Sequence, residues 1–368
     1  MVNGVHAKTG GGATYLSSVL PLLADDDELE VHLFLHRQQF SMFKGLDDRI
    51  RIHLFDFPPN TASLLAWEQL ALPIIARGMA ADIVFSPANF GPLLCGSSVV
   101  LLRNALAVGQ REARLGKRLY WAVLALATGL SILRSRRVIA VSNYAATALT
   151  RHLPASARRK VSVVHHGVRP QFLAAPAAEA RDAYLLVVGD IYIQKNLHTM
   201  LEAINQVRAS EPEIRVKIVG RVVDRGYFLQ LEDLIRRLGL QDCVAFLGHV
   251  GQDALIELYR RCRLLVFPST VETFGHPLVE AMACGTAIAS SNTTAMPEIL
   301  DDAGLYFDPL DRDDMAARIL QLYRDAALRK ELGDRGRRRA EEFSLLKTAQ
   351  ETARVLKAAA RPARMPAR

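Results

Sequence analysis

The chain has 368 residues, half of them hydrophobic and 23% charged, which is typical of a globular protein with about two or three domains. Its four cysteines are scattered and form no C-x-x-C pair, so the sequence predicts neither a zinc site nor a disulfide framework. The net charge of +8 suits anionic partners, but aromatic residues make up 7% of the chain and no nucleic-acid-binding motif is recognisable. We therefore expect no nucleic-acid partner.

Apolar runs alternate with helical stretches along the chain, a pattern typical of parallel α/β folds. In the first half the predicted strands are 30–35, 51–55, 82–86, 98–102 and 137–142, with helices at 13–23 and 63–77. Before them, a short strand from Val2 to Val5 leads into three glycines, Gly10, Gly11 and Gly12. Strands average about five or six residues, so this short start is compatible with native residues upstream of Met1. Glycines before a helix predict a loop that a ligand can approach closely.

The first residues show no basic region followed by an apolar core, so we expect no signal peptide and a cytoplasmic protein. The most membrane-like stretch is the fifteen uncharged residues from Leu119 to Leu133, whereas a membrane span needs about 20. Basic residues flank both ends of this stretch. We predict a buried helix of the N-terminal half. The alternative is a basic surface helix that rests on anionic lipid at the inner face of the cytoplasmic membrane.

The second half repeats the strand–helix pattern. Its predicted strands are 184–188, 215–219, 244–247, 264–268, 287–290 and 305–307, and its predicted helices are 196–208, 227–238, 253–261 and 313–324. An alanine-rich segment with two prolines, 169–182, separates the halves as a linker does. A helical pattern at 341–359 precedes a basic tail, 360–368, that we expect to be disordered.

The segment from Glu272 to Gly285 reads ETFGHPLVEAMACG and follows a predicted buried strand. Pro277 suits a first helical position and Gly285 suits a helix stop, so we predict a loop followed by a short helix. Glu272 would lie in the loop at the carboxyl end of the strand, and Glu280 about one turn into the helix. Ligands bind at this edge of an open α/β sheet. Two carboxylates at this spacing are, by themselves, more typical of a solvated helix.

The whole string, with the AMPEI that follows as far as Glu298, resembles the E-x₇-E signature of retaining, nucleotide-sugar-dependent glycosyltransferases of family 4. The resemblance covers nearly the whole chain. It implies the GT-B fold, in which two Rossmann-like domains with parallel sheets face each other across a cleft. Combined with the linker, it predicts an acceptor-side domain at 1–170, a nucleotide-sugar-binding domain at 171–342, a helix at 343–359 that crosses back to the first domain, and the tail 360–368.

The resemblance also assigns roles to residues. Glu272 would act at the donor sugar, Glu280 would hold the ribose hydroxyls, and Lys195 would grip the donor pyrophosphate. A carboxylate suits vicinal hydroxyls because it can accept two hydrogen bonds. The implied catalytic residues are Glu272 and Lys195, and the implied donor-binding residues are Glu280, Phe274, Gly275, His276, Gly189, Asn196, Gly11 and Gly12.

The sequence departs from the family's pattern at two places. Asp190 stands where relatives often carry an arginine beside the pyrophosphate, which a carboxylate would repel. Arg221, at the end of the next predicted strand, is the candidate substitute. Many relatives have a histidine-containing turn after the strand at 98–102, whereas this chain has Arg103 and Asn104, which we place on the acceptor side.

The function that the resemblance implies is transfer of a hexose, with retention, from a nucleoside-diphosphate sugar to a hydroxyl of a glycan or lipid-linked acceptor in bacterial envelope polysaccharide synthesis. The first-domain strings WEQLALP and DIVFSPANFGPL are similar to those of mannosyltransferase-like members, which favours GDP-mannose over a UDP-sugar. No bound cofactor or required metal is expected. Two alternatives stay open: an inactive, glycosyltransferase-like binding or scaffold protein, and a sugar-nucleotide epimerase of the same architecture.

Overall fold

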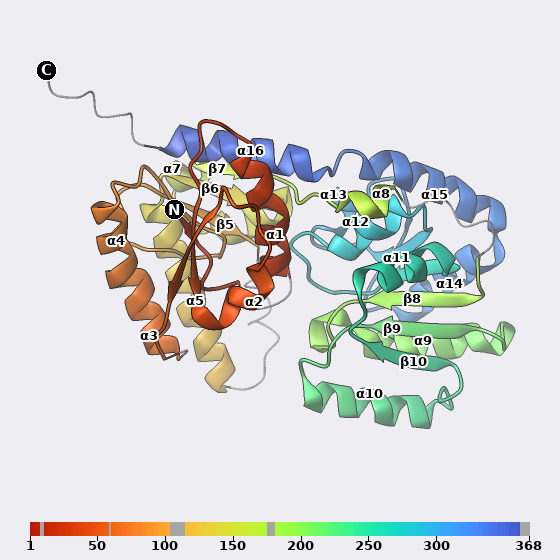
Figure 1. Ribbon diagram of the computed structural model, residues 1–368. Coiled ribbons are helices and arrows are strands. Elements are labelled where there is room, and N and C mark those ends of the chain that lie inside the picture. The colour runs from red at the N-terminus through yellow and green to blue at the C-terminus, as the bar shows by residue number, and fades with distance from the viewer. Residues whose placement is uncertain (8–10, 59, 104–114, 175–180, 361–368) are drawn as a thin grey trace, which may run out of the picture. The chain divides into compact units, whose positions relative to one another are not determined.

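The computed structural model describes residues 1–7, 11–58, 60–103, 115–174 and 181–360 (Figure 1). Its contacts divide the chain into two compact units. The first unit is Met1–Gly167 together with the C-terminal segment that begins at Leu345, and the second is Val168–Ser344. Each unit is a parallel sheet flanked by helices.

The first unit contains a seven-stranded sheet in the order β3-β2-β1-β4-β5-β6-β7, and all its strand pairs are parallel. The strands are β1 Val2–Asn3, β2 His32–His36, β3 Arg51–Phe55, β4 Val84–Ser86, β5 Ser98–Leu102, β6 Arg137–Ala140 and β7 Val161–Val163. Every residue of β5 is buried, as expected for a strand that helices cover on both faces. The order reverses between β1 and β4.

The helices of this unit are α1 Gly11–Ala24, α2 Phe40–Phe43, α3 Thr61–Ala66, α4 Leu72–Gly78, α5 Leu115–Arg134, α6 Asn143–Thr150, α7 Ala155–Arg158 and α16 Leu345–Ala359, with a 3₁₀ turn at Arg37–Gln39. The single helix predicted at 63–77 is interrupted by a π-turn, Trp67–Ala71, that joins α3 to α4. Pro73 explains the wider turn, because its ring crowds the carbonyl four residues earlier and its nitrogen cannot donate. Helix α16 packs on α1, where the Tyr15 and Thr352 hydroxyls are 3.2 Å apart.

Helix α5 corrects the prediction of a buried helix at 119–133. Val123, Leu126 and Leu130 are exposed, whereas Thr128 and Ser131 are buried. The helix therefore turns two hydroxyl groups and Ile132 toward the protein and several leucines toward the outside. Among the described residues, no helix combines the length and the hydropathy that crossing a bilayer requires.

The second unit contains a six-stranded parallel sheet in the order β10-β9-β8-β11-β12-β13. Its strands are β8 Tyr184–Val188, β9 Arg215–Val219, β10 Val244–Gly248, β11 Leu264–Phe267, β12 Ile288–Ser291 and β13 Leu305–Phe307. Its helices are α8 Pro170–Leu173, α9 Leu197–Ser210, α10 Arg225–Arg237, α11 Gln252–Arg261, α12 His276–Ala283, α13 Met296–Leu300, α14 Arg312–Arg324 and α15 Ala326–Ala340, with a 3₁₀ turn at Ile193–Lys195. The strand order reverses between β8 and β11.

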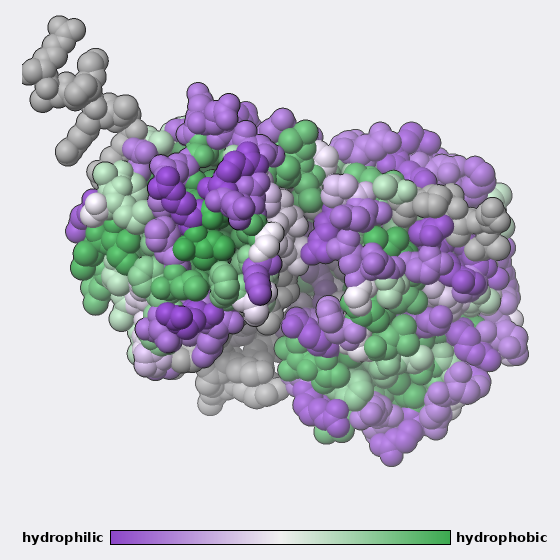
Figure 2. All heavy atoms as spheres, viewed as in Figure 1, coloured by the Kyte–Doolittle hydropathy of each residue, from purple (hydrophilic) through white to green (hydrophobic). Residues whose placement is uncertain are grey.

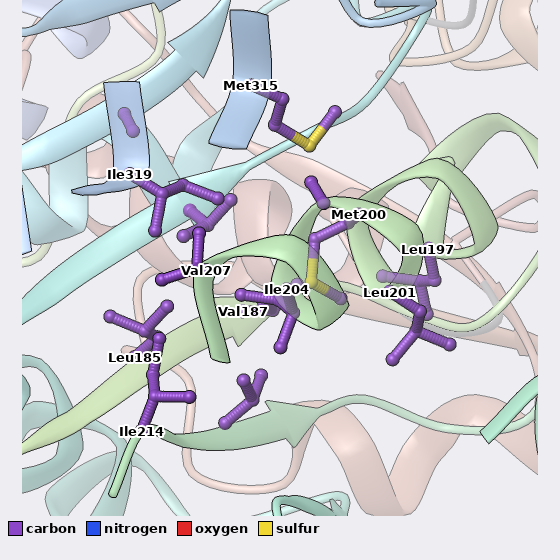
Figure 3. Close-up of a cluster of buried hydrophobic side chains, with 14 of the residues drawn as sticks. Leu185, Val187, Leu197, Met200, Leu201, Ile204, Val207, Ile214, Met315 and Ile319 are labelled. Carbon is purple, nitrogen blue, oxygen red and sulfur yellow. The ribbon is translucent and has the colours of Figure 1, made fainter. Parts of the chain in front are cut away.

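The core of the second unit lies between this sheet and helices α9 and α14 (Figure 3). Leu197, Leu201 and Ile204 follow one another at intervals of three or four residues on α9, so they share the face that is turned to the sheet. Met315 and Ile319 of α14 complete this packing. The strands that lead to the candidate site are thereby packed against α9 and α14.

Candidate active site

The strongest candidate site of the second unit lies where the strand order reverses. Strand β8 ends at Val188 and leads through Gly189 to the turn that carries Lys195, and β11 leads to the loop that carries Glu272. The Lys195 Nζ donates a hydrogen bond to Glu272 Oε1 at 2.6 Å. Their side chains are only 12% and 17% exposed. Loops after the two strands that flank such a reversal form the usual ligand site of an open α/β sheet.

Burial by itself would lower the pKa of Lys195. The charge of Glu272, with smaller effects from Tyr192 and Asp190, outweighs burial and raises this pKa above its usual value. Lys195 is therefore a permanent cation. Gly189 allows it to lie against the end of β8, because a Cβ at Gly189 would stand 2.8 Å from the Lys195 Cε. These two predicted site residues are thus in direct contact.

Asn196 is buried and has a left-handed backbone, with φ of 54°. Its side-chain nitrogen donates to the carbonyl oxygens of Pro268 (3.1 Å) and Pro309 (2.6 Å). Its side-chain oxygen accepts from the Thr199 hydroxyl at 2.8 Å. With both amide hydrogens donated inside the protein, the side chain fixes the turn that carries Lys195 to the end of β11 rather than reaching outward.

The residues between the two glutamates shape the start of α12. Phe274 is 3% exposed and packs edge-on against Phe343, with ring centroids 5.9 Å apart. Its ring also meets that of His276, at 5.2 Å. Gly275 caps the helix with φ of 90°, a conformation that glycine adopts without strain. His276 and Pro277 then open the helix, so the sequence prediction of a loop and a short helix is confirmed here.

Glu280 is half-buried on α12. The Tyr259 hydroxyl of α11 donates to its Oε2 at 2.9 Å. Burial raises the pKa of Glu280, while the Tyr259 bond and the charge of Arg169 oppose this rise. Arg169 in turn donates to Gln252. Tyr259 and Arg169 were not recognised from the sequence, because neither belongs to a motif and Arg169 lies in the segment that we predicted to be a linker.

Asp190 is paired with Arg221, at the ends of β8 and β9. Arg221 donates to this carboxylate from its backbone nitrogen at 3.0 Å and from Nη2 at 2.6 Å. Burial would raise the pKa of Asp190, but these bonds outweigh it and hold the pKa below its usual value. The carboxylate is therefore ionised and neutralised. Arg221, the candidate substitute for the relatives' arginine, thus follows β9 and neutralises Asp190.

In the first unit, the structure brings Gly12 and Arg103 together. Helix α1 begins at Gly11, and a Cβ at Gly12 would stand 2.1 Å from an Arg103 guanidinium nitrogen. The Arg103 backbone nitrogen donates to Asn89 Oδ1 at 2.9 Å, and burial lowers the pKa of the guanidinium. Gly10 and Asn104 lie outside the described residues.

A second feature of this unit was not assigned from the sequence. Glu68, fully buried on the π-turn, lies 3.1 Å from His6 Nε2 and accepts from Asn3 Nδ2 at 2.9 Å. His6 follows β1, and its ring packs edge-on against Phe90, which follows β4. The imidazole therefore lies where the strand order of this sheet reverses. Single π-turns inside helices are frequent at functional sites.

No group of three or more histidine, cysteine, aspartate or glutamate side chains within the described ranges is arranged to hold a metal ion. The polar groups of the second unit described above are the Lys195 cation, the Glu272 and Glu280 carboxylates, and Asp190 neutralised by Arg221. This combination suits an anionic ligand that also carries hydroxyl groups.

Two family models match the chain. Glycosyltransferase Family 4 matches residues 9–172, and Glycosyl transferases group 1 matches residues 168–339. The chain is 34% identical over 165 residues, 45% of its length, to the O-antigen chain mannosyltransferase B of Escherichia coli, and covers 43% of that protein. It is 35% identical over 241 residues to the D-inositol 3-phosphate glycosyltransferase of Streptomyces avermitilis, a match that takes in 61% of this chain and 52% of that one. The chain thus spans about half the length of these relatives.

Solved structures share the fold. The chain superposes on HepE of Anabaena in complex with UDP and glucose with a TM-score of 0.78 and 19% identity, over 97% of this chain and 98% of that one. Sucrose-phosphate synthase from Thermosynechococcus elongatus also gives a TM-score of 0.78, with 18% identity and the same shares. Together, the two family models, the mannosyltransferase relative and these likenesses place the chain among the family 4 glycosyltransferases, with the GT-B fold.

Proposed function

We propose that the protein is a retaining glycosyltransferase that moves a hexose from a nucleoside-diphosphate sugar to a hydroxyl of a glycan or lipid-linked acceptor. We assign it to bacterial envelope polysaccharide synthesis at the inner face of the cytoplasmic membrane. The buried Lys195–Glu272 pair at the β8/β11 reversal carries the proposal. In this pair, Lys195 is the cation that would bind the diphosphate, and Glu272 is the carboxylate that would accept hydrogen bonds from the sugar hydroxyls.

In the proposed reaction, the bond between the anomeric carbon and the diphosphate oxygen breaks, and the acceptor oxygen bonds to the same face of that carbon. The leaving diphosphate takes the acceptor's proton. Negative charge grows on the diphosphate, and Lys195 and Arg221 are the cations at this edge that would stabilise it. Once the diphosphate pairs with Lys195, Glu272 is released to accept hydrogen bonds from the sugar.

For the donor we favour GDP-mannose, because the mannosyltransferase of Escherichia coli is among the relatives. A UDP-sugar is the alternative, since HepE was solved with UDP and glucose. A screen that incubates the protein with GDP-mannose and UDP-hexoses, together with acceptor extracts, tests the proposal. Transfer of labelled sugar from one donor supports it, and absence of both transfer and nucleotide-induced thermal stabilisation refutes it. Nucleotide binding without transfer or donor hydrolysis would favour the inactive binding protein, and conversion of the donor to its epimer would favour the epimerase.

The Glu280→Gln substitution is expected to weaken nucleoside-diphosphate binding at least tenfold and to stabilise the ligand-free protein at neutral pH. The first effect follows from losing a charged acceptor for ribose hydroxyls, worth about 1.5–3 kcal/mol. The second follows from the raised pKa of Glu280. A group with a raised folded-state pKa adds stability below its unfolded pKa and loses it as the pH rises through the folded pKa. The glutamine side chain does not ionise, so the variant does not lose this stability as the pH rises.

Melting temperatures with and without GDP or UDP, measured from pH 4 to 8, test both effects. Asp233→Asn is the control, because Asp233 is an exposed helix residue of the same unit. A nucleotide-induced shift in the Glu280→Gln variant equal to that of the wild type would contradict the ribose assignment.

We further propose that His6, oriented by Glu68, faces the acceptor hydroxyl. The His6→Ala substitution should lower transfer about 100-fold, because a misplaced acceptor hydroxyl can cost that much, and leave nucleotide binding unchanged. His32→Ala is the matched control. His32 has a similar exposed fraction (15% against 17%) and a Glu30 oxygen at 3.2 Å, but it begins β2 at the opposite edge of the sheet. Acceptor-dependent kinetics that respond equally to both substitutions would contradict the role.

A further inference from the structure

Helix α5 exposes one stripe of large apolar side chains. Val123, Leu126, Leu130 and Leu133 are 59%, 64%, 40% and 41% exposed. Their spacing of three and four residues places them on one side of the helix. A helix that borders water normally shows the reverse arrangement, with its apolar stripe turned to the core.

The opposite side of α5 is buried and carries hydroxyl groups beside the side chain of Ile132. The Ser131 hydroxyl accepts from the Gly91 nitrogen at 3.2 Å, and the Thr128 hydroxyl donates to the Leu124 carbonyl at 2.8 Å. Both side chains are buried. The Thr128 bond lies within α5, whereas the Ser131 bond ties the helix to the loop before β5, and the leucines of the stripe face outward.

Neighbouring elements expose large apolar side chains as well. Leu65, Leu70 and Ile74 of the α3–α4 segment are 57%, 59% and 66% exposed, and Leu94 is 57% exposed. Figure 2 shows hydrophobic residues gathered over α4, at the left edge of the view. We call the eight residues of both sets the apolar face: Leu65, Leu70, Ile74, Leu94, Val123, Leu126, Leu130 and Leu133.

Hydrogen bonds tie the two parts of the apolar face together. Gln69 of the π-turn donates from Nε2 to the Gly91 carbonyl, in the loop before β5, at 3.2 Å. The Leu93 nitrogen of the same loop donates to Gln69 Oε1 at 2.9 Å. The same Gly91 is held by Ser131 of α5. Leu94 follows directly in this loop. The α3–α4 segment, the loop and α5 therefore lie side by side.

Positive charge is concentrated in the same part of the chain. Residues 69–167 contain thirteen lysines and arginines but only two acidic residues, Asp82 and Glu112, although the whole chain carries +8. The Lys160 ammonium donates to the Leu133 carbonyl at 2.7 Å, and Arg77 lies 3.5 Å from the Leu94 carbonyl. Within the described residues, neither cation forms an ion pair with a carboxylate. One cation thus stands beside Leu133 and another beside Leu94, and both leucines belong to the apolar face.

We propose that the apolar face docks on the surface of an anionic phospholipid bilayer. The leucines would enter the boundary between headgroups and acyl chains, while the flanking cations contact lipid phosphates. A second copy of the chain is a poorer partner, because pairing the same face would bring two positively charged surfaces together. The proposal concerns a surface of the first unit and stands apart from the donor site of the second.

Flotation of the full chain with phosphatidylcholine vesicles, with and without phosphatidylglycerol, tests the proposal. Binding is expected only with the anionic lipid and should weaken as salt is added. The Leu126→Ser/Leu130→Ser variant should bind on the order of 100-fold more weakly, because two leucines lose their apolar environment. Arg134 ends α5 and Arg137 begins β6, and both are exposed beside Leu133 in the sequence. The Arg134→Gln/Arg137→Gln variant should bind about 20-fold more weakly.

Leu229→Ser is the matched control, since Leu229 is a 51% exposed helix residue of the second unit. It should bind vesicles like the wild type. An unchanged nucleotide-induced thermal shift confirms that each variant is folded. The proposal is overturned by a wild type that does not bind anionic vesicles, by equal binding to neutral vesicles, or by wild-type binding in the double leucine variant. A concentration-dependent dimer that the leucine substitutions dissociate would overturn it as well.

Discussion

Glu272→Ala is expected to reduce sugar transfer by about 10³-fold, on the order of 4 kcal/mol in the barrier, without lowering the affinity for GDP or UDP. The carboxylate is proposed to hold the donor sugar, so its loss affects the transition state. A nucleoside diphosphate carries no sugar. The nucleoside diphosphate also competes with Glu272 for Lys195. In the Glu272→Ala variant Lys195 no longer has this partner, so the diphosphate can bind it without competition.

Transfer of labelled sugar and calorimetric titration with the nucleoside diphosphate measure the two effects separately. Glu272→Gln tests the role of charge, because the amide keeps one acceptor oxygen. Glu257→Ala serves as the control, since Glu257 is a half-exposed glutamate of α11 in the same unit. Transfer at the wild-type rate in Glu272→Ala would remove this residue from the sugar site.

Lys195→Ala is expected to lower both stability and nucleotide binding. Removing one member of a largely buried pair leaves the other charge without compensation, which costs about 3 kcal/mol. For a unit of this size, that corresponds to a melting temperature lower by about 6–12 °C. The affinity for the nucleoside diphosphate should fall about 100-fold, because the cation proposed to face the phosphates is gone.

Lys330→Ala provides a control at the same distance. Its ammonium also lies 2.6 Å from a carboxylate, that of Asp334, but the two side chains are 80% and 49% exposed. We expect no measurable change in melting temperature, because exposed pairs contribute little. A Lys195→Met/Glu272→Gln double variant separates the effects: it should regain most of the stability without regaining nucleotide affinity. If Lys195→Ala binds the nucleotide as the wild type does, the phosphate role is wrong.

Much of the second unit could be predicted from the sequence. The strands at 184–188, 215–219 and 305–307 are found at the predicted residues, because each is an apolar run bounded by turn residues. The start of α12 at His276 was also predictable, since Pro277 and the preceding glycine are local signals. Helix α15 was not predicted, because its polar composition shows little apolar periodicity.

The π-turn at Trp67–Ala71 marks a limit of pattern analysis. The apolar pattern there suits one continuous helix, but Pro73 widens the turn before it and points Glu68 into the protein. The pairing of Glu68 with His6 joins residues 62 positions apart. Such a contact depends on the order of strands β1 and β4, which no local signal specifies.

The sequence by itself determined the alternation of strands and helices, the glutamate signature and the position of Lys195 after β8, because each depends on residues close together in the chain. Only the tertiary structure decided which polar groups meet: Lys195 with Glu272 across 77 positions, Glu280 with Tyr259, and Asp190 with Arg221. It also decided that the leucines of α5 face outward. The physical reason is that local propensity fixes an element, whereas neighbouring elements fix which of its faces are covered and which charges lose their water.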